Sequence, residues 1–402
     1  MEKSRKPKIR FKGYNDDWEQ RKVQDVADRF DNLRIPVAAN LRVHGTTPYY
    51  GANGIQDYVD GFTHDGEFVL VAEDGANDLK NYPVKCVNGR VWVNNHAHVL
   101  QGKARIADNS FLAFAISQSD IESLLVGGGR AKLNAETLMS IEFRLPCLQE
   151  QYRIGEYLSQ LDNLITLHQR KLDKLVNVKK SMLEKMFPQQ GSKIPEIRFC
   201  GFTDDWEQRK LDSLCKLITK QTGFDYSETI KPALVTDKEL NTYSFIQNKD
   251  FEGENINLDT DFYIPIEVAE RFPKIILDMP SLLISISGKI GNVGYYGLKT
   301  KAFIGGAVGI CKLKEDIGSM LVYALQSEAG QTYFRSLIKA SSHANITVED
   351  IRNIIIKLPH NERESQKVAE YFCNLDHLIT LHQRKLEKLK NIKKSMLEKM
   401  FI

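Results

Sequence analysis

The sequence predicts an α+β chain with two mixed domains and two long helices, which pair antiparallel as a coiled coil about an internal pseudo-twofold axis. Three observations predict this arrangement. The chain repeats itself, each copy ends in a long stripe of apolar residues at helical spacing, and the stretches between the repeats differ in sequence but close alike. With 402 residues, of which 42% are hydrophobic, two or three domains can each bury a core.

The composition excludes several classes of protein. The chain has 55 Lys and Arg against 52 Asp and Glu, which together with its apolar content is typical of a folded protein. Residues 1–13 are basic and polar, and the apolar neighbourhood at 275–286 is interrupted by Asp278 and Pro280, so we expect neither a signal peptide nor a membrane span. Six scattered cysteines without metal-ligand spacing indicate a reduced, cytoplasmic protein without a metal site.

Two pairs of segments define the repeat. PKIRFKGYNDDWEQRK at 7–22 and PEIRFCGFTDDWEQRK at 195–210 agree at 12 of 16 positions, with an offset of 188. The segments 161–187 and 375–401 agree at 23 of 27 positions, with an offset of 214. Trp18 and Trp206 occupy the same place in the opening segments, which predicts core packing against the helices or, alternatively, the same contact with a partner.

The repeat sets the expected boundaries. We expect a first variable domain at 1–148, a long helix at 149–189, a second variable domain at 190–362 and a second long helix at 363–402. Each variable stretch ends in a short helix with Asn134 or Thr347 as its N-cap, followed by a strand and a proline. PQQGSKIP at 188–195 ends the first helix and turns the chain. Because Ile402 falls where the first copy breaks, we expect a natural carboxyl terminus.

The two helices carry a heptad stripe with polar interruptions. Equal register in a parallel pair would place Lys179 against Lys393, and two facing ammonium groups are costly. An antiparallel pair instead sets Leu161 against Met400 and His168 against Lys393. The expected helix-pair seam is Leu161, Ile165, His168, Leu172, Leu175, Lys179, Met182, Met186, Leu375, Ile379, His382, Leu386, Leu389, Lys393, Met396 and Met400.

Signatures of catalysis are missing from the sequence. It contains no phosphate-binding loop, no G-x-G-x-x-G between a strand and a helix, no G-x-S-x-G and no H-E-x-x-H. The Asn-Pro-Pro-Tyr and Asp-Pro-Pro-Tyr strings of adenine-amine methyltransferases are missing as well. Together these observations predict a binding protein without catalytic residues.

The complete arrangement resembles the specificity subunit of type I restriction-modification systems. The resemblance rests on the order DDWEQRK, variable domain, LITLHQRKL and KKSMLEKMF, which then occurs a second time. Segments 49–55, 65–67 and 72–75 in the first domain, and 287–291 and 341–358 in the second, are similar to target-recognition domains of that family.

The resemblance implies a division of labour among several subunits. Each variable domain would be a target-recognition domain that reads one half of a bipartite sequence in double-stranded DNA, and the helices would fix the gap. Two modification subunits would dock on the chain and carry S-adenosylmethionine for adenine methylation. Restriction subunits would supply ATP- and Mg-dependent translocation and cleavage. No cofactor is expected on this chain.

The charge distribution points in another direction. Residues 31–145 hold ten Lys and Arg but thirteen Asp and Glu, whereas DNA-binding modules usually have a basic surface. Basic residues collect instead on the helices, with six at 170–185 and seven at 384–399. We therefore expect weak DNA binding by the isolated chain. A coiled-coil scaffold whose variable domains bind proteins remains an alternative, as does an enzyme with an unrecognised site.

Base readers should be polar side chains on loops, because reading needs donors and acceptors at a groove edge. The first-domain candidates are Arg34, Arg42, Tyr50, Asn53, Asn77, Asn94, His96, Arg130 and Lys132. The second-domain candidates are Lys220, Gln221, Lys289, Asn292, Tyr295, Ser342, His343 and Asn345.

Overall fold

The structure, a computed structural model, describes residues 6–127, 131–297, 300–340 and 345–401. It divides into two compact units, Met1–Arg170 with Gln383–Ile402, and Lys171–His382. Each unit therefore combines one variable domain with parts of both long helices, whereas the sequence predicted boundaries at the helix ends. The described residues contain no helix that is both long and apolar enough to span a membrane.

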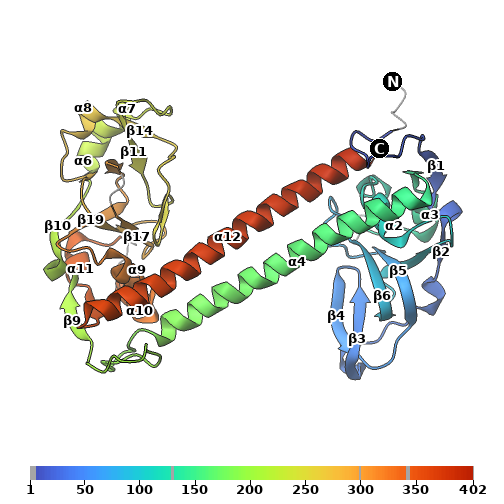
Figure 1. Cartoon of the computed structure of the whole chain (residues 1–402), viewed down its shortest axis with the longest axis horizontal. Coiled ribbons are helices and arrows are strands. Elements are labelled where there is room, and N and C mark those ends of the chain that lie inside the picture. Colours follow the sequence, from blue (N-terminus) through green and yellow to red (C-terminus); the bar gives the residue numbers. More distant parts are fainter. Residues whose placement is uncertain (1–5, 128–130, 298–299, 341–344, 402) are drawn as a thin grey trace. The chain divides into compact units, whose positions relative to one another are not determined.

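The first unit is built on a six-stranded sheet with the order β2-β7-β5-β6-β3-β4 (Figure 1). Neighbouring strands are antiparallel except β3 and β6, which run parallel with Tyr49 opposite Trp92. Helix α2 packs on β5 and β6. The elements are β1 (Glu19–Lys22), α1 (Val23–Val26), β2 (Ala27–Arg29), η1 (Asp31–Leu33), η2 (Ala39–Leu41), β3 (His44–Gly51), β4 (Gly54–Val59), β5 (His64–Ala72), β6 (Val84–Val93), β7 (Ala97–Gly102), α2 (Asn109–Ser117), η3 (Glu122–Leu124), α3 (Ala135–Ser140) and β8 (Glu142–Leu145).

The second unit has a different core, made of two four-stranded sheets with the orders β10-β19-β16-β17 and β14-β11-β18-β15. The elements are β9 (Glu207–Lys210), α5 (Leu211–Leu214), β10 (Cys215–Lys220), α6 (Gly223–Asp225), η4 (Tyr226–Ile230), α7 (Lys231–Ala233), β11 (Thr242–Ile246), β12 (Phe251–Glu252), β13 (Asn255–Ile256), β14 (Tyr263–Pro265), α8 (Ile266–Ala269), β15 (Ile276–Leu277), β16 (Ser281–Ser285), β17 (Val293–Tyr296), β18 (Ala302–Ile304), β19 (Val308–Leu313), α9 (Gly318–Gln326), α10 (Glu328–Ala340), α11 (Val348–Arg352) and β20 (Ile355–Leu358).

The repeated segments form the same frame in both units. Strand β1 pairs with β8, with Glu19 opposite Leu145, and β9 pairs with β20, with Glu207 opposite Leu358. The predicted short helices precede β8 and β20 as α3 and α11. Thr347 caps α11 by accepting a hydrogen bond from the Asp350 N–H, but Asn134 makes no side-chain cap to α3. The frame is therefore repeated, and the domain that it carries is not.

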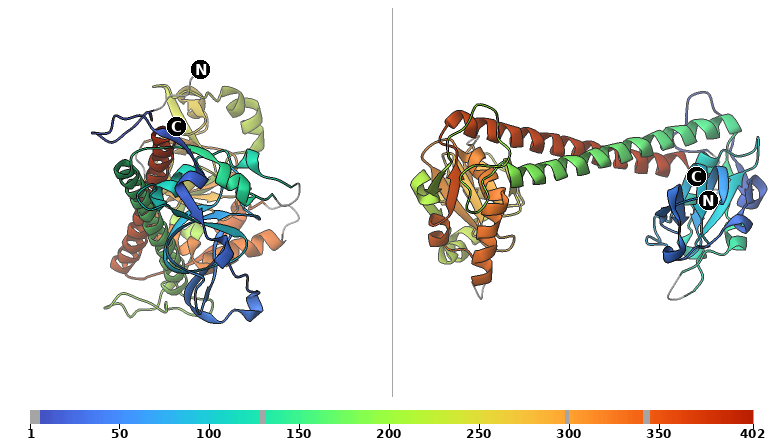
Figure 2. Two further views of the ribbon diagram at one scale, coloured as in Figure 1. Left: turned by 90° about the vertical axis from the view of Figure 1, so that its right-hand side faces the viewer. Right: turned by 90° about the horizontal axis from the view of Figure 1, so that it is seen from below.

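The long helices are α4 (Leu148–Lys185) and α12 (Glu362–Met400), of 38 and 39 residues. In the first unit, Leu161 of α4 belongs to the same apolar cluster as Met396 and Met400 of α12. In the second unit, Met186, the residue directly after α4, belongs to the same apolar cluster as Leu375 of α12. The beginning of each helix thus meets the end of the other, so the helices run antiparallel within each unit (Figure 2).

None of the sixteen predicted seam residues is exposed. The polar interruptions are accommodated by carboxylates. The Lys393 ammonium lies 2.5 Å from Asp162 Oδ1, and the Lys179 ammonium lies 2.6 Å from Asp376 Oδ1. The sequence predicted Lys393 opposite His168 but did not predict this ion pair, in which the ammonium group gains more from a carboxylate than it would from an imidazole. The two pairs are equivalent under the repeat.

The opening segments fasten the helices in both units. Arg10 makes two hydrogen bonds of 2.7 Å to Glu150 of α4, and the Ile9 N–H donates to the Lys399 carbonyl of α12. Trp18 is 3% exposed and packs against Phe111 and Phe401.

In the second unit Arg198 bonds Glu364 at 2.6 and 2.8 Å, and the Ile197 N–H donates to the Lys185 carbonyl. Trp206 is also 3% exposed and packs against Phe187. The two tryptophans share their packing role and differ in one bond: the Trp206 indole N–H donates to Glu364, whereas Trp18 Nε1 has no partner among the described residues.

Candidate nucleic-acid interface

A network of polar side chains, several of them charged, joins segments of the first domain. It comprises Asp31, Arg34, Glu73, Asp74, His96, His98 and Lys132, and is called the first-domain polar network below. Glu73, which follows β5, accepts bonds from Arg34 at 2.6 Å and from Lys132 at 2.8 Å. Asp74, the next residue, pairs with His96 at 2.5 Å. Strand β5 thus delivers two carboxylates that hold three of the predicted base readers.

Two carboxylates of this network, those of Asp31 and Glu73, favour the ionised form. Burial by itself raises the pKa of Asp31, but hydrogen bonds from His98 and from the Val99 N–H outweigh it and leave that pKa below its ordinary value. Burial also opposes ionisation of Glu73, and the bonds from Lys132 and Arg34 again lower its pKa. Both carboxylates are therefore charged near neutral pH. The contribution that their hydrogen bonds and ion pairs make to folding stability is lost only as the pH falls through their lowered pKa values.

The network does not suit a metal ion, although three of its ligand-type residues are close together. One atom each of Asp31, Glu73 and His98 lies within 4.8 Å of the others. The Arg34 guanidinium and the Lys132 ammonium already neutralise these carboxylates, so a cation would have to displace them. The arrangement is that of an ion-pair network.

Other first-domain candidates lie near the network and differ in exposure. Asn53 is exposed and links two loops, because its side chain donates to the Gly75 carbonyl and accepts from the Asn77 N–H. Asn77 is exposed and no bond from its side chain is seen among the described residues. Tyr50 and Asn94 are only 6% and 3% exposed, so most of each side chain is packed within the domain.

Arg42 lies apart from the network. Its guanidinium sits 4.1 Å from the centre of the Tyr49 ring, donates to the Val37 carbonyl and bonds Asp57 at 3.3 Å. These contacts use its planar face and several of its donors. Arg130 lies outside the described residues.

The second domain brings its candidates together through a different set of loops. The Asn248 side chain donates to the Ser287 carbonyl, the Ile286 N–H to the Ala307 carbonyl and the Ile346 N–H to the Ile286 carbonyl. Exposed Lys220, Lys289 and Asn345 lie on or beside these loops. Ser342 and His343 lie outside the described residues.

Three further second-domain candidates are structurally engaged or enclosed. The Asn292 amide donates to the Asn248 and Phe251 carbonyls, which uses both of its hydrogens. Tyr295 is 9% exposed and donates to Asp316, and burial together with this carboxylate raises its pKa. Gln221 is 4% exposed, and neither of its amide atoms has a hydrogen-bond partner among the described residues.

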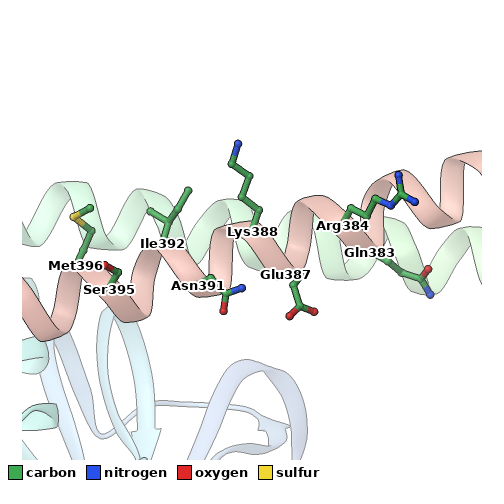
Figure 3. Close-up of a pocket in the computed structure, with 8 residues that line it drawn as sticks. All are labelled: Gln383, Arg384, Glu387, Lys388, Asn391, Ile392, Ser395 and Met396. Atoms are coloured by element: carbon green, nitrogen blue, oxygen red, sulfur yellow. The ribbon is translucent and has the colours of Figure 1, made fainter. Parts of the chain in front are cut away.

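A groove of about 650 Å³ runs along α12 in the first unit. It is lined by Gln383, Arg384, Glu387, Lys388, Asn391, Ile392, Ser395 and Met396. Figure 3 shows Lys388 and Glu387 projecting to opposite sides of the helix. The lining offers one carboxylate and a serine without a histidine or second acid beside it, so it supplies no nucleophile and base for catalysis.

Sequence reasoning missed Asp31, Glu73 and His98, although segment 72–75 was singled out. These residues were missed because charged side chains are usually exposed. The sequence does not show that Glu73, after strand β5, lies against Arg34 from an earlier turn. The useful signal was the pair of carboxylates directly at the end of an apolar strand. The exposed groups of both domains are hydrogen-bond donors and acceptors on loops, which suits recognition of polar edges.

Comparison with known proteins gives a consistent result. A model of the type I restriction modification DNA specificity domain matches residues 15–177 and 203–391. The chain is 44% identical over 146 residues to a putative type I restriction enzyme specificity subunit of Haemophilus influenzae, a match that spans 36% of this chain and 38% of that protein. It is 24% identical over 412 residues to the type I restriction enzyme MjaVIII specificity subunit of Methanocaldococcus jannaschii, covering 95% of this chain and 91% of the other.

A solved structure shares the fold. The crystal structure of the type I restriction-modification system S subunit from M. genitalium aligns with a TM-score of 0.67 over 99% of both chains, at 14% sequence identity.

Proposed function

Because the chain belongs to the type I restriction modification DNA specificity family, matched over both of its halves, we propose that each variable domain reads one half of an asymmetric bipartite DNA target. The resemblance predicted from the repeated frame is thereby confirmed. The chain is the DNA-recognition component of such a system and is not itself catalytic. Family membership favours DNA reading over the scaffold and enzyme alternatives.

One observation carries the proposal of an asymmetric target. The frame is duplicated down to the register of its strand pairs, yet one frame holds a six-stranded sheet and the other holds two four-stranded sheets. Different folds present their donors and acceptors in different arrangements, so we expect the two domains to read different half-sites. The exposed groups most suited to reading are Asn53, Asn77, Lys220, Lys289 and Asn345.

The helices would set the gap between the half-sites. A helix of 38 residues is about 57 Å long, and one turn of B-DNA is about 34 Å, so half-sites separated along one duplex are within reach. S-adenosylmethionine, ATP and Mg would be bound by the modification and restriction subunits. We expect the chain to bind DNA in the cytoplasm.

Methylome sequencing tests the proposed function directly. A host that expresses this chain with its modification subunit should acquire adenine methylation at one bipartite motif. Replacing residues 24–146 by the corresponding segment of another family member should change one half of that motif and preserve the other. A change in both halves, or no methylation although the complex assembles, would contradict the proposal.

Each copy of the repeat has an exposed pair of leucines that we propose as the docking point of one modification subunit. Leu164 and Leu167 of α4 are 43% and 61% exposed, and their equivalents Leu378 and Leu381 of α12 are 40% and 39% exposed. Residues three apart share one helix face, so each pair forms a small apolar patch. Two equal patches on one chain suit two copies of one partner.

Changing these leucines to glutamine should weaken docking. The Leu164→Gln, Leu167→Gln variant should hold one modification subunit about 100-fold more weakly, because two leucines lose the gain from burial. The variant with all four leucines changed should hold neither subunit, as measured by native mass spectrometry. Val176→Gln is the matched control, because Val176 is 45% exposed on α4 but its equivalent is Lys390. Retention of both subunits by the four-leucine variant would rule out this docking surface.

A further inference from the structure

Gln221 directly follows strand β10 and is buried with both ends of its amide unpaired. The residue is 4% exposed, and neither Nε2 nor Oε1 has a hydrogen-bond partner among the described residues. Buried polar atoms of folded proteins are almost always hydrogen-bonded, because an unmade bond costs the full desolvation of the group. Two such atoms on one side chain therefore point to a hydrogen-bonding partner from outside the chain.

A second buried glutamine shows what such a side chain does when its role is structural. Gln151 of α4 is 1% exposed. Its Oε1 accepts the Asp108 N–H at 3.0 Å, and its Nε2 donates to the Pro146 and Ile106 carbonyls at 2.8 and 3.0 Å. That amide joins three backbone groups and uses both of its hydrogens. The Gln221 amide makes no bond of this kind within the described part of the chain, so a role in fastening segments does not explain it.

The Gln221 amide lies next to an exposed turn. Gly306 is exposed, and a Cβ atom built on it would lie 3.2 Å from Gln221 Oε1. The turn at 305–307 joins β18 to β19 and begins with two glycines. Because glycine has no side chain and accepts many backbone conformations, this turn is suited to a local movement that uncovers the amide.

The same edge of the second domain carries its exposed polar candidates. Strand β10 pairs with β19, the Ile286 N–H donates to the Ala307 carbonyl, and the Ile346 N–H donates to the Ile286 carbonyl. The segments around 221, 307, 286 and 346 therefore lie side by side at one end of this sheet. The exposed candidates come from these segments and the loop beside them, namely Lys220, Lys289 and Asn345. An amide uncovered here would join groups that suit a DNA groove.

The two unpaired atoms together match one base. In the major groove adenine presents an acceptor, N7, beside a donor, its N6 amino group, and a glutamine amide pairs with both. Guanine presents two acceptors there, so the same amide cannot pair with both of them. We propose that Gln221 reads an adenine of the second half-site when the turn at 305–307 moves off its amide. The inference rests on the proposed function and names a base that the second domain selects.

Replacing Gln221 by leucine separates reading from folding. Leucine needs no hydrogen bond, so Gln221→Leu should raise the urea midpoint of the full chain, whereas the matched control Gln151→Leu should lower it by leaving three backbone groups unpaired. In a host that expresses Gln221→Leu with the modification subunit, methylome sequencing should show that one A·T pair of the second half-site is no longer required. Preference for that pair should fall about 10- to 100-fold, and the first half-site should be unchanged.

A modified base tests the contact itself. 7-Deazaadenine has a C–H group in place of N7, so it removes the acceptor that Gln221 Nε2 would use. At that position of a target duplex it should weaken binding by the assembled wild-type complex about 10-fold and leave binding by the Gln221→Leu complex unchanged.

Two results would overturn the inference. One is a lower urea midpoint for Gln221→Leu, which would show that the amide supports the fold. The other is a Gln221→Leu methylation motif equal to that of the wild type, as expected if bound water alone pairs with the amide. A wild type that methylates no bipartite motif would instead contradict the proposed function.

Discussion

Arg10→Ala should destabilise the first unit by about 3–5 kcal/mol. Glu150 has no exposed side-chain surface, and Arg10 neutralises it with two charge-assisted bonds of 2.7 Å. Truncation leaves a carboxylate buried without its cation, which costs more than the pair itself contributes. Urea unfolding followed by fluorescence should show a lower midpoint.

The second copy supplies a comparison within the same chain. Arg198→Ala also strands a buried carboxylate, but Glu364 keeps the Trp206 indole as a donor, so this variant should cost about 1 kcal/mol less than Arg10→Ala. Arg21→Ala is the control, because Arg21 and its partner Glu19 are 50% and 68% exposed, and such pairs contribute about 0–1 kcal/mol. If Arg10→Ala costs no more than Arg21→Ala, the opening segment does not fasten the helices.

The internal repeat was sufficient to predict the two long helices and the opening segments that pack against them. Two near-identical helices fixed each other's extent, and both end within a few residues of the expected positions. The Arg10–Glu150 and Arg198–Glu364 pairs were not predicted, although both arginines lie in the matched segments. A glutamate near a helix start is usually exposed, and its burial here depends on how the opening segment docks.

The base readers were less predictable, because residue type gives hydrogen-bonding capacity but not the partner that uses it. Asn292 and Asn53 are similar in sequence terms, yet both hydrogens of the Asn292 amide are used by carbonyls, whereas Asn53 is exposed and its amide donates to one carbonyl. Tyr50 and Asn94 were chosen for their polar groups and turned out to be buried. The variable domains do not resemble each other in sequence. Comparing them therefore could not show which polar residues lie on loops and which lie in the core.

The polar interruptions of the seam were identified from the sequence, but the carboxylates that pair with Lys179 and Lys393 were not predicted. The heptad stripe predicts which residues face the other helix. Asp162 and Asp376 each follow a seam leucine by one position, beside the stripe rather than on it. A lysine side chain is long enough to reach such a flanking carboxylate while its methylene groups stay in the seam.

Asp376→Lys should therefore cost about 3 kcal/mol of stability in the second unit. Lys179 and Asp376 are 19% and 17% exposed, and the variant both removes this ion pair and sets two ammonium groups together. It also removes the acceptor of the Tyr323 hydroxyl, which donates to Asp376 at 3.1 Å.

Adding Lys179→Asp to Asp376→Lys should recover all but about 1 kcal/mol, because the pair is restored in reverse. In the first unit, Asp162→Lys should cost only about 1 kcal/mol, since Asp162 is 41% exposed and water screens its pair with Lys393. The double-mutant cycle, measured by urea unfolding, isolates the coupling of the two residues. A double variant no more stable than Asp376→Lys would show that this ion pair does not define the helix register, because the coupling depends on these two side chains facing each other across the antiparallel pair.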